Sequence, residues 1–226
     1  MFTFVACCAC SVAQADDLYN NLGDTNAPSY YADWDGGSGD IGGGTSYGLQ
    51  TGQVFSSSIT GSLTSVEGIF ENASATPQLQ GALVQLFNFS GGVVGTEVGE
   101  QNVAGSITDL GPSRYFNNRF ESDVRADVSI AGLVAGQEYL AVIQPHGINW
   151  GWLEDNNDGN HHTFCRDFSL YGSQPGFGTT TWRESGTFSG FFSGDSVMRI
   201  QGTPVPEPGS LAVLVLGCIA VLRRRR

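Results

Sequence analysis

The chain has 226 residues, which is enough for one ordinary domain plus targeting segments. Hydrophobic residues make up 40% of it, and the many aromatic and branched aliphatic residues among them argue against a disordered chain. The 32 glycines and only 14% charged residues argue against a helical bundle. The sequence contains no lysine, and residues 16–205 carry 21 Asp and Glu against six Arg, so nucleic acid is excluded as an expected partner. This acidity suits an exported protein that binds neutral partners such as glycans.

Residues 1–15 have features of a signal peptide. A short apolar stretch ends in Ala13-Gln14-Ala15, and signal peptidase cleaves after small residues at this spacing, so we expect cleavage after Ala15. The usual basic segment is missing, which leaves an upstream start codon and an atypical signal as alternatives. A lipoprotein signal, with Cys7 or Cys8 as the lipidated residue, is a third. Beyond this segment only Cys165 precedes the C-terminal apolar run, so no disulfide is expected within the domain.

Residues 16–204 alternate strand-like runs with turns rich in Gly, Asn and Asp. The clearest strand is Val124–Ile130, in which apolar and polar residues alternate. A turn through Gly136 leads to Tyr139–Ile143, which is apolar on both faces, as in a central strand. Further strands are predicted at Thr51–Ile59, Ser62–Phe70, Ala82–Phe89, Phe164–Tyr171, Thr180–Phe191 and Ser196–Gln201. Strands spaced about ten residues apart predict an all-β, antiparallel β-sandwich of jelly-roll type, with an up-and-down barrel as the alternative.

Two acidic segments contain candidate calcium ligands. Asp33, Asp35 and Asp40 lie in a glycine-rich predicted loop, and Asp155 and Asp158 lie in a second acidic turn. Calcium requires oxygen ligands, which a tightly curved loop can supply from alternating positions. Neither segment matches a complete calcium-binding motif, and solvated turns are the alternative. No other cofactor is expected.

Three tryptophans are candidate glycan contacts. Trp150, Trp152 and Trp182 fall in or near predicted loops, where exposed indole rings stack on the apolar faces of sugars. Packing within the sandwich core is the alternative for each of them.

The sequence does not predict an enzyme. It contains no nucleophile elbow and no phosphate-binding loop, and acidic pairs are too common in it for any one to indicate a glycosidase. His162 and Cys165 are three residues apart but lack the paired spacing of a transition-metal site.

The C-terminal segment, residues 205–226, is the most specific signal in the chain. An apolar run, Leu211–Leu222, would form a helix about 18 Å long, shorter than a bilayer core of about 30 Å. Terminal arginines can snorkel and resist translocation, so we expect a short transmembrane helix with the domain outside and the arginines inside. The predicted sorting residues are Val205, Pro206, Glu207, Pro208, Arg223, Arg224, Arg225 and Arg226.

This order of Val-Pro-Glu-Pro, apolar helix and arginine cluster resembles the PEP-CTERM sorting signal. The resemblance implies recognition by exosortase, a membrane cysteine protease-transpeptidase, which would cut near the motif. A plain membrane anchor is the alternative. The run from Leu133 to Ile143, the two nearby tryptophans and a closing strand at 198–202 are also similar to other PEP-CTERM ectodomains. That similarity implies a jelly roll whose final strand lies beside the first.

Three parts are therefore predicted: a signal peptide (1–15), an ectodomain (16–204) and a sorting tail (205–226). The predicted function is a non-enzymatic envelope or extracellular-matrix protein, structural or adhesive in an exopolysaccharide-rich envelope. Its expected partners are signal peptidase, exosortase and, transiently, the inner membrane, followed by polysaccharide or other surface proteins. A secreted carbohydrate-binding or carbohydrate-active protein is the alternative.

Overall fold

A computed structural model describes residues 15–22, 30–38, 49–72, 79–112, 120–146, 149–155, 163–167, 182–184 and 195–205. All regular elements within these ranges are β-strands. They are β1 (Asp16–Asn20), β2 (Tyr30–Ser38), β3 (Leu49–Ser56), β4 (Gly61–Asn72), β5 (Gly81–Ser90), β6 (Val93–Val103), β7 (Ser106–Pro112), β8 (Phe120–Leu133), β9 (Glu138–His146), β10 (Asn149–Asp155), β11 (Thr163–Asp167), β12 (Arg183–Glu184), β13 (Asp195–Ser196) and β14 (Met198–Pro204).

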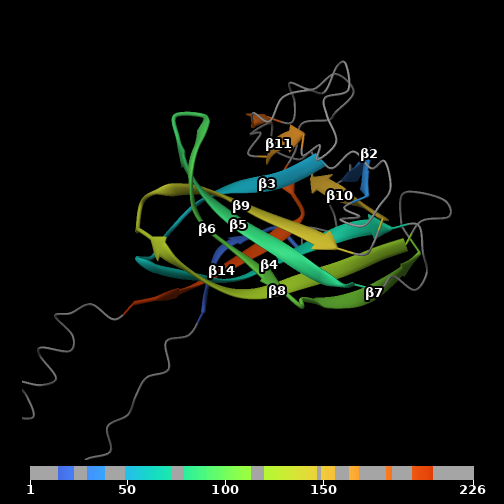
Figure 1. Cartoon of the computed structure of the whole chain (residues 1–226), viewed down its shortest axis with the longest axis horizontal. Coiled ribbons are helices and arrows are strands. Elements are labelled where there is room, and N and C mark those ends of the chain that lie inside the picture. The colour runs from blue at the N-terminus through green and yellow to red at the C-terminus, as the bar shows by residue number, and fades with distance from the viewer. Residues whose placement is uncertain are drawn as a thin grey trace, which may run out of the picture.

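The strands form two antiparallel sheets (Figure 1). In the first, called sheet A, β7, β8, β4, β14 and β1 are successive neighbours, and β10 pairs with β4, β2 and β13. In the second, sheet B, the order is β12-β11-β3-β9-β5-β6. The described strands thus form two separate sheets rather than one closed barrel. The prediction of an all-β fold with antiparallel sheets is confirmed.

The main hydrophobic core lies between the two sheets. It takes side chains from alternate positions of β4, β8 and β14 in sheet A and of β3, β5 and β9 in sheet B. Residues such as Leu63, Val124 and Ile143 are completely buried, and each contributes about 1.5–3 kcal/mol by leaving water. The predicted alternation in Val124–Ile130 is confirmed, because Val124, Ala126 and Ile130 are in this core while Asp127 is exposed.

Strand β9 is buried on both faces, as its sequence predicted. Tyr139, Ala141 and Ile143 belong to the main core. Leu140 and Val142 belong to a second apolar cluster with Val54, Phe87, Phe89, Val94 and Trp182. The members of this cluster alternate with core residues along β3, β5 and β9, so it lies on the outer face of sheet B.

Candidate functional site

The first and last strands of the domain lie side by side at one edge of sheet A (Figure 1), as expected. Asp16 lies opposite Gly202 in their antiparallel register. The Asp17 carboxylate accepts hydrogen bonds from Arg199 Nε at 2.9 Å and Gln201 Nε2 at 2.8 Å. The hydrogen bond from Arg199 is the main cause that holds the pKa of Asp17 below its usual range. The chain therefore enters and leaves the domain at neighbouring points.

Of the predicted sorting residues, Val205 alone is within the described ranges. It is exposed, and its backbone N–H donates to the carbonyl oxygen of Thr60 at 3.0 Å. Pro206, Glu207, Pro208 and Arg223–Arg226 lie outside these ranges, as do the residues before Ala15. No helix in the part of the chain that the structure describes is long and apolar enough to cross a bilayer.

The structure separates the three candidate tryptophans. Trp150 and Trp152 lie in β10 of sheet A, where Trp152 is opposite the core residue Phe70. Trp182 packs on the outer face of sheet B, with its ring 5.4 Å from that of Phe87. Trp150 and Trp152, which were expected in or near loops, lie within a strand, with Trp150 at its second position. Their segment is a strand because β4 and β2, distant in sequence, supply its backbone partners.

The predicted calcium segments also differ from expectation. Asp33 and Asp35 lie in strand β2 rather than a loop, and Asp155 is the last residue of β10. Asp40 and Asp158 lie outside the described residues. Because β2 and β10 are paired, two segments predicted as separate loops are neighbours in one sheet. Among the residues with described positions, no group of three or more His, Cys, Asp or Glu could hold a metal ion.

Two carboxyl groups are close together on the outer face of sheet A. Glu67 Oε2 and Asp123 Oδ1 are buried, and neither accepts a hydrogen bond from a donor in the described part of the chain. Arg125 is paired with Glu67, and its Nη1 lies 3.6 Å from Oε2. Burial, with the hydrogen bond and charge of Glu67, raises the pKa of Asp123 to about 7. Asp123 therefore keeps its proton to a higher pH than an ordinary carboxyl group does.

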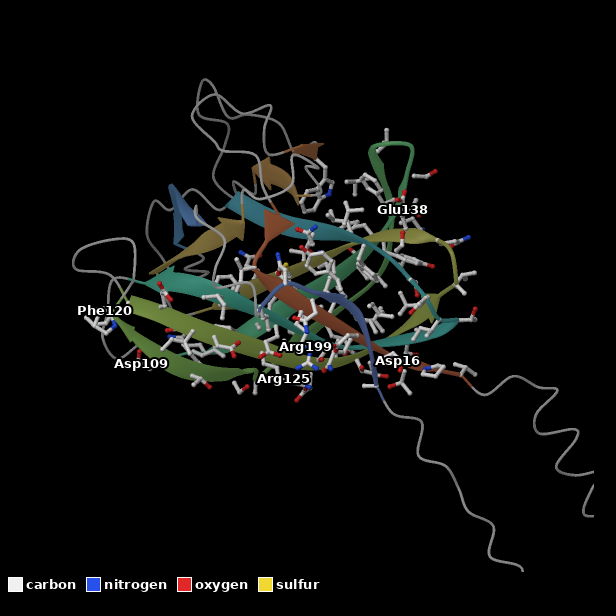
Figure 2. All side chains as sticks on the ribbon, turned by 180° about the vertical axis from the view of Figure 1, so that it is seen from behind. Asp16, Asp109, Phe120, Arg125, Glu138 and Arg199 are labelled. Atoms are coloured by element: carbon white, nitrogen blue, oxygen red, sulfur yellow. The ribbon has the colours of Figure 1, made fainter. Side chains whose placement is uncertain are left out.

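A surface hollow of about 550 Å³ lies at the end of sheet B, below the β5–β6 hairpin. Its base is one row of three adjacent strands, because Glu138 of β9 lies opposite both Phe89 of β5 and Ser56 of β3. The remaining lining residues are Asn88, Ser90, Gly136 and Gln137. Figure 2 shows Glu138 at the foot of the projecting hairpin. The lining residues thus carry one aromatic ring, two amides, two hydroxyls and one carboxyl group.

Both walls of the hollow are held by specific contacts. The hairpin turns at Gly91 and Gly92, whose φ angles of 59° and 77° are those of a two-residue type I′ turn. Its strands are joined by a hydrogen bond from Asn88 Nδ2 to Thr96 Oγ1 at 3.1 Å. The opposite wall is the β8–β9 turn, in which the Tyr139 hydroxyl accepts from the N–H of Val134 at 2.9 Å.

Backbone hydrogen bonds fix the β8–β9 turn to the end of β3. Gly136 donates its N–H to the carbonyl oxygen of Ser57 at 2.8 Å, and Ser57 donates to the carbonyl oxygen of Gln137 at 2.9 Å. The Tyr139 hydroxyl also lies 3.1 Å from Gln137 Oε1. Gly136 and Gln137 therefore have fixed positions at the rim of the hollow.

Sequence reasoning did not identify this hollow. Phe89 marked the end of a predicted strand, and Glu138 immediately preceded another, but nothing local indicated that they face each other. The one available signal was that two successive residues on one face of β5, Phe87 and Phe89, are both aromatic.

No protein-family model matches the chain, and comparisons with curated proteins and with solved structures gave no significant match. The PEP-CTERM resemblance of residues 205–226 therefore stays a prediction from the sequence.

Proposed function

We propose that the chain is a non-enzymatic envelope or extracellular-matrix protein, with a jelly-roll-like ectodomain, that is exported and then sorted through its C-terminal tail by exosortase. Signal peptidase would act first and the inner membrane would hold the tail transiently. After release, the ectodomain would adhere to polysaccharide or to other surface proteins. The observation that carries this proposal is the pairing of β1 with β14, which puts the two ends of the domain next to each other.

This arrangement suits two successive membrane-proximal cuts. Asp16, the first residue after the predicted signal peptide, is opposite Gly202, three residues before the predicted tail begins at Val205. A domain held at such neighbouring points presents its opposite end away from the membrane. Either cut then leaves the strand pairing intact, because both predicted sites lie outside β1 and β14.

Intact-mass analysis of the full gene product, expressed in its own host and fractionated into membrane and extracellular material, tests the proposal. We expect a species that begins at Asp16 and ends between Val205 and Pro208, outside the inner membrane. Alanine at both Pro206 and Pro208 should block the second cut, whereas Pro112→Ala, at the end of β7, should not. A product that keeps Arg223–Arg226 in the inner membrane would contradict sorting and leave a plain anchor.

The hollow favours the second candidate, a secreted carbohydrate-binding protein, in its non-catalytic form. Glycoside hydrolysis ordinarily uses two carboxyl groups on either side of the scissile bond. The described lining of the hollow supplies one, that of Glu138. Glu67 and Asp123 lie on the outer face of sheet A and so cannot complete such a pair.

A further inference from the structure

The hollow at the end of sheet B has the composition of a site for a polyhydroxylated ligand. Phe89 provides a half-buried ring that packs on the apolar cluster behind it, so the ring is supported rather than freely mobile. Beside it in the register are the carboxyl group of Glu138 and the hydroxyl group of Ser56. A sugar needs this combination, because its C–H face packs on an aromatic ring while its hydroxyls need polar partners at the edges.

The apolar support continues behind the hollow. In the next row along the same three strands, Leu140 lies opposite both Val54 and Phe87. These three side chains are buried, and Trp182 packs edge-on against Phe87 at 5.4 Å. The row that lines the hollow therefore borders a packed apolar row, which supports the base of the hollow on that side.

The charge of the lining residues limits which ligands of suitable size the hollow can bind. A volume of about 550 Å³ falls within the range of small-molecule sites. The described lining contains one carboxyl group and no cationic side chain, within a domain that has 21 acidic residues and six arginines. Phosphate, sulfate and uronic acid groups would be repelled there. Asn88 Nδ2 already donates to Thr96 Oγ1, and Gln137 Oε1 lies 3.1 Å from the Tyr139 hydroxyl. The polar groups in the same row as Phe89 are therefore those of Glu138 and Ser56.

We propose that this hollow binds a segment of a neutral oligosaccharide, with Phe89 as the stacking ring and Glu138 as the acceptor for sugar hydroxyls. The inference rests on the proposed function, which says where the protein would meet the ligand. It adds the class of ligand and the residues that bind it. Both walls are fixed before ligand arrives, by the Asn88–Thr96 contact on one side and the backbone contacts of Ser57 on the other. Such preorganisation lowers the entropic cost of binding.

The test uses the purified full-length chain in a detergent without a sugar headgroup. Calorimetric titrations employ neutral pentasaccharides of glucose, mannose and N-acetylglucosamine. The deacetylated, cationic form of the last and an anionic galacturonate pentamer serve as charge controls. We expect at least one neutral pentasaccharide to bind with a Kd on the order of 0.1–1 mM, and the galacturonate pentamer not to bind. Absence of binding by every neutral pentasaccharide at about 10 mM would overturn the proposal.

Matched variants locate the binding. Glu138→Gln and Phe89→Leu should each weaken binding by about tenfold. Their controls are Glu100→Gln, on the edge strand β6, and Leu110→Ala, on β7 of the other sheet, which should bind as the wild type does. Phe89→Leu keeps apolar volume, so a cooperative thermal transition is expected to persist and can be checked for each variant.

Two other outcomes would also overturn the assignment. One is equal binding by all four variants, which would place the sugar elsewhere on the chain. The other is binding of the cationic pentamer alone, lost in Glu138→Gln and kept in Phe89→Leu, which would indicate a charge site. Because these titrations use purified protein, they can fail while the processing test succeeds, and the reverse also holds.

Discussion

The fold raises the pKa of Asp123 well above that of an ordinary carboxyl group. This residue lies on β8 beside Glu67 of β4, and burial with this neighbour raises its pKa to about 7. In the unfolded chain its pKa returns to about 3.8. Between these two values the folded chain binds a proton that the unfolded chain does not. This proton stabilises the fold below about pH 4, and its contribution is lost as the pH rises through 7.

Asp123→Asn is therefore expected to flatten the dependence of stability on pH. The amide resembles the protonated acid at any pH. Between pH 5 and pH 8 the free energy of unfolding of the variant should therefore rise relative to that of the wild type by about 1–2 kcal/mol, a figure reduced because the side chain is partly exposed. Guanidinium unfolding at the two pH values measures the difference.

Asp127→Asn is the matched control for this prediction. Asp127 lies on the same strand, is exposed and pairs with Arg125 Nε at 2.9 Å. Its substitution should leave the pH dependence close to that of the wild type. A pH dependence in Asp123→Asn equal to that of the wild type would show that the fold does not raise the pKa of Asp123.

The carboxyl pair could not have been identified from the sequence. Glu67 and Asp123 are two of 21 acidic residues in the domain, and 56 positions separate them. They are close because β4 and β8 are paired in one register, with Ile69 opposite Asp123 and Glu67 opposite Arg125. A shift of one residue in that register would turn one carboxyl group to the opposite face.

At the scale of elements, the sequence predicted six interior strands, β3, β4, β5, β8, β9 and β14, but it did not predict β10, which pairs with three strands. β8 and β9 carry alternating or continuous apolar residues because one or both of their faces are buried. β6 and β7 were not predicted, since they are edge strands whose residues are mostly exposed and include several Gly, Glu and Asp. Edge strands need little apolar surface and so give little periodic signal.

Gly61, the first residue of β4, is packed too closely for any side chain larger than hydrogen. A Cβ at Gly61 would collide with the carbonyl oxygen of Thr203 and lie 3.0 Å from the Cα of Pro204. These are backbone atoms of β14, so the collision cannot be relieved by a rotamer change. Gly61→Ala should lower the free energy of unfolding by about 1–3 kcal/mol, as measured by guanidinium denaturation.

Gly95→Ala is the comparison for this substitution. Gly95 lies in edge strand β6, where the nearest atom to an added Cβ is the carbonyl oxygen of Asn88 at 3.3 Å. Its effect should stay within about 0.5 kcal/mol, as for ordinary surface positions. Equal effects of the two substitutions would mean that β4 and β14 do not approach as closely as described.

For the whole molecule, the main consequence of the topology is that the two ends of the domain are neighbours. β1 and β14 pair through Asp16 and Gly202, and Asp17 bonds to Arg199 and Gln201 across them. Ser65 of β4 extends this chain of contacts, because its hydroxyl donates to Gln201 Oε1 at 2.9 Å. The terminal strands are thus joined to the centre of sheet A.

A circular permutant tests this arrangement. Joining Val205 to Asp16 through a linker of about six Gly and Ser residues, with new ends between Gly91 and Gly92, should give a chain that unfolds cooperatively and retains the far-UV spectrum of β-sheet. The same linker with new ends inside β4, between Val66 and Glu67, should prevent folding. Failure of the first permutant to fold would contradict the pairing of the terminal strands.

The sequence by itself determined the strand content of the best-buried elements, the acidic surface and the presence of the tail motif, because each depends on local composition and alternation. The tertiary structure alone decided which strands are neighbours and in which register. That choice made strands of the segments containing Asp33 and Trp150, and it put Phe89 beside Glu138. Register depends on backbone hydrogen bonds between distant segments, so no local pattern in the chain could have specified it.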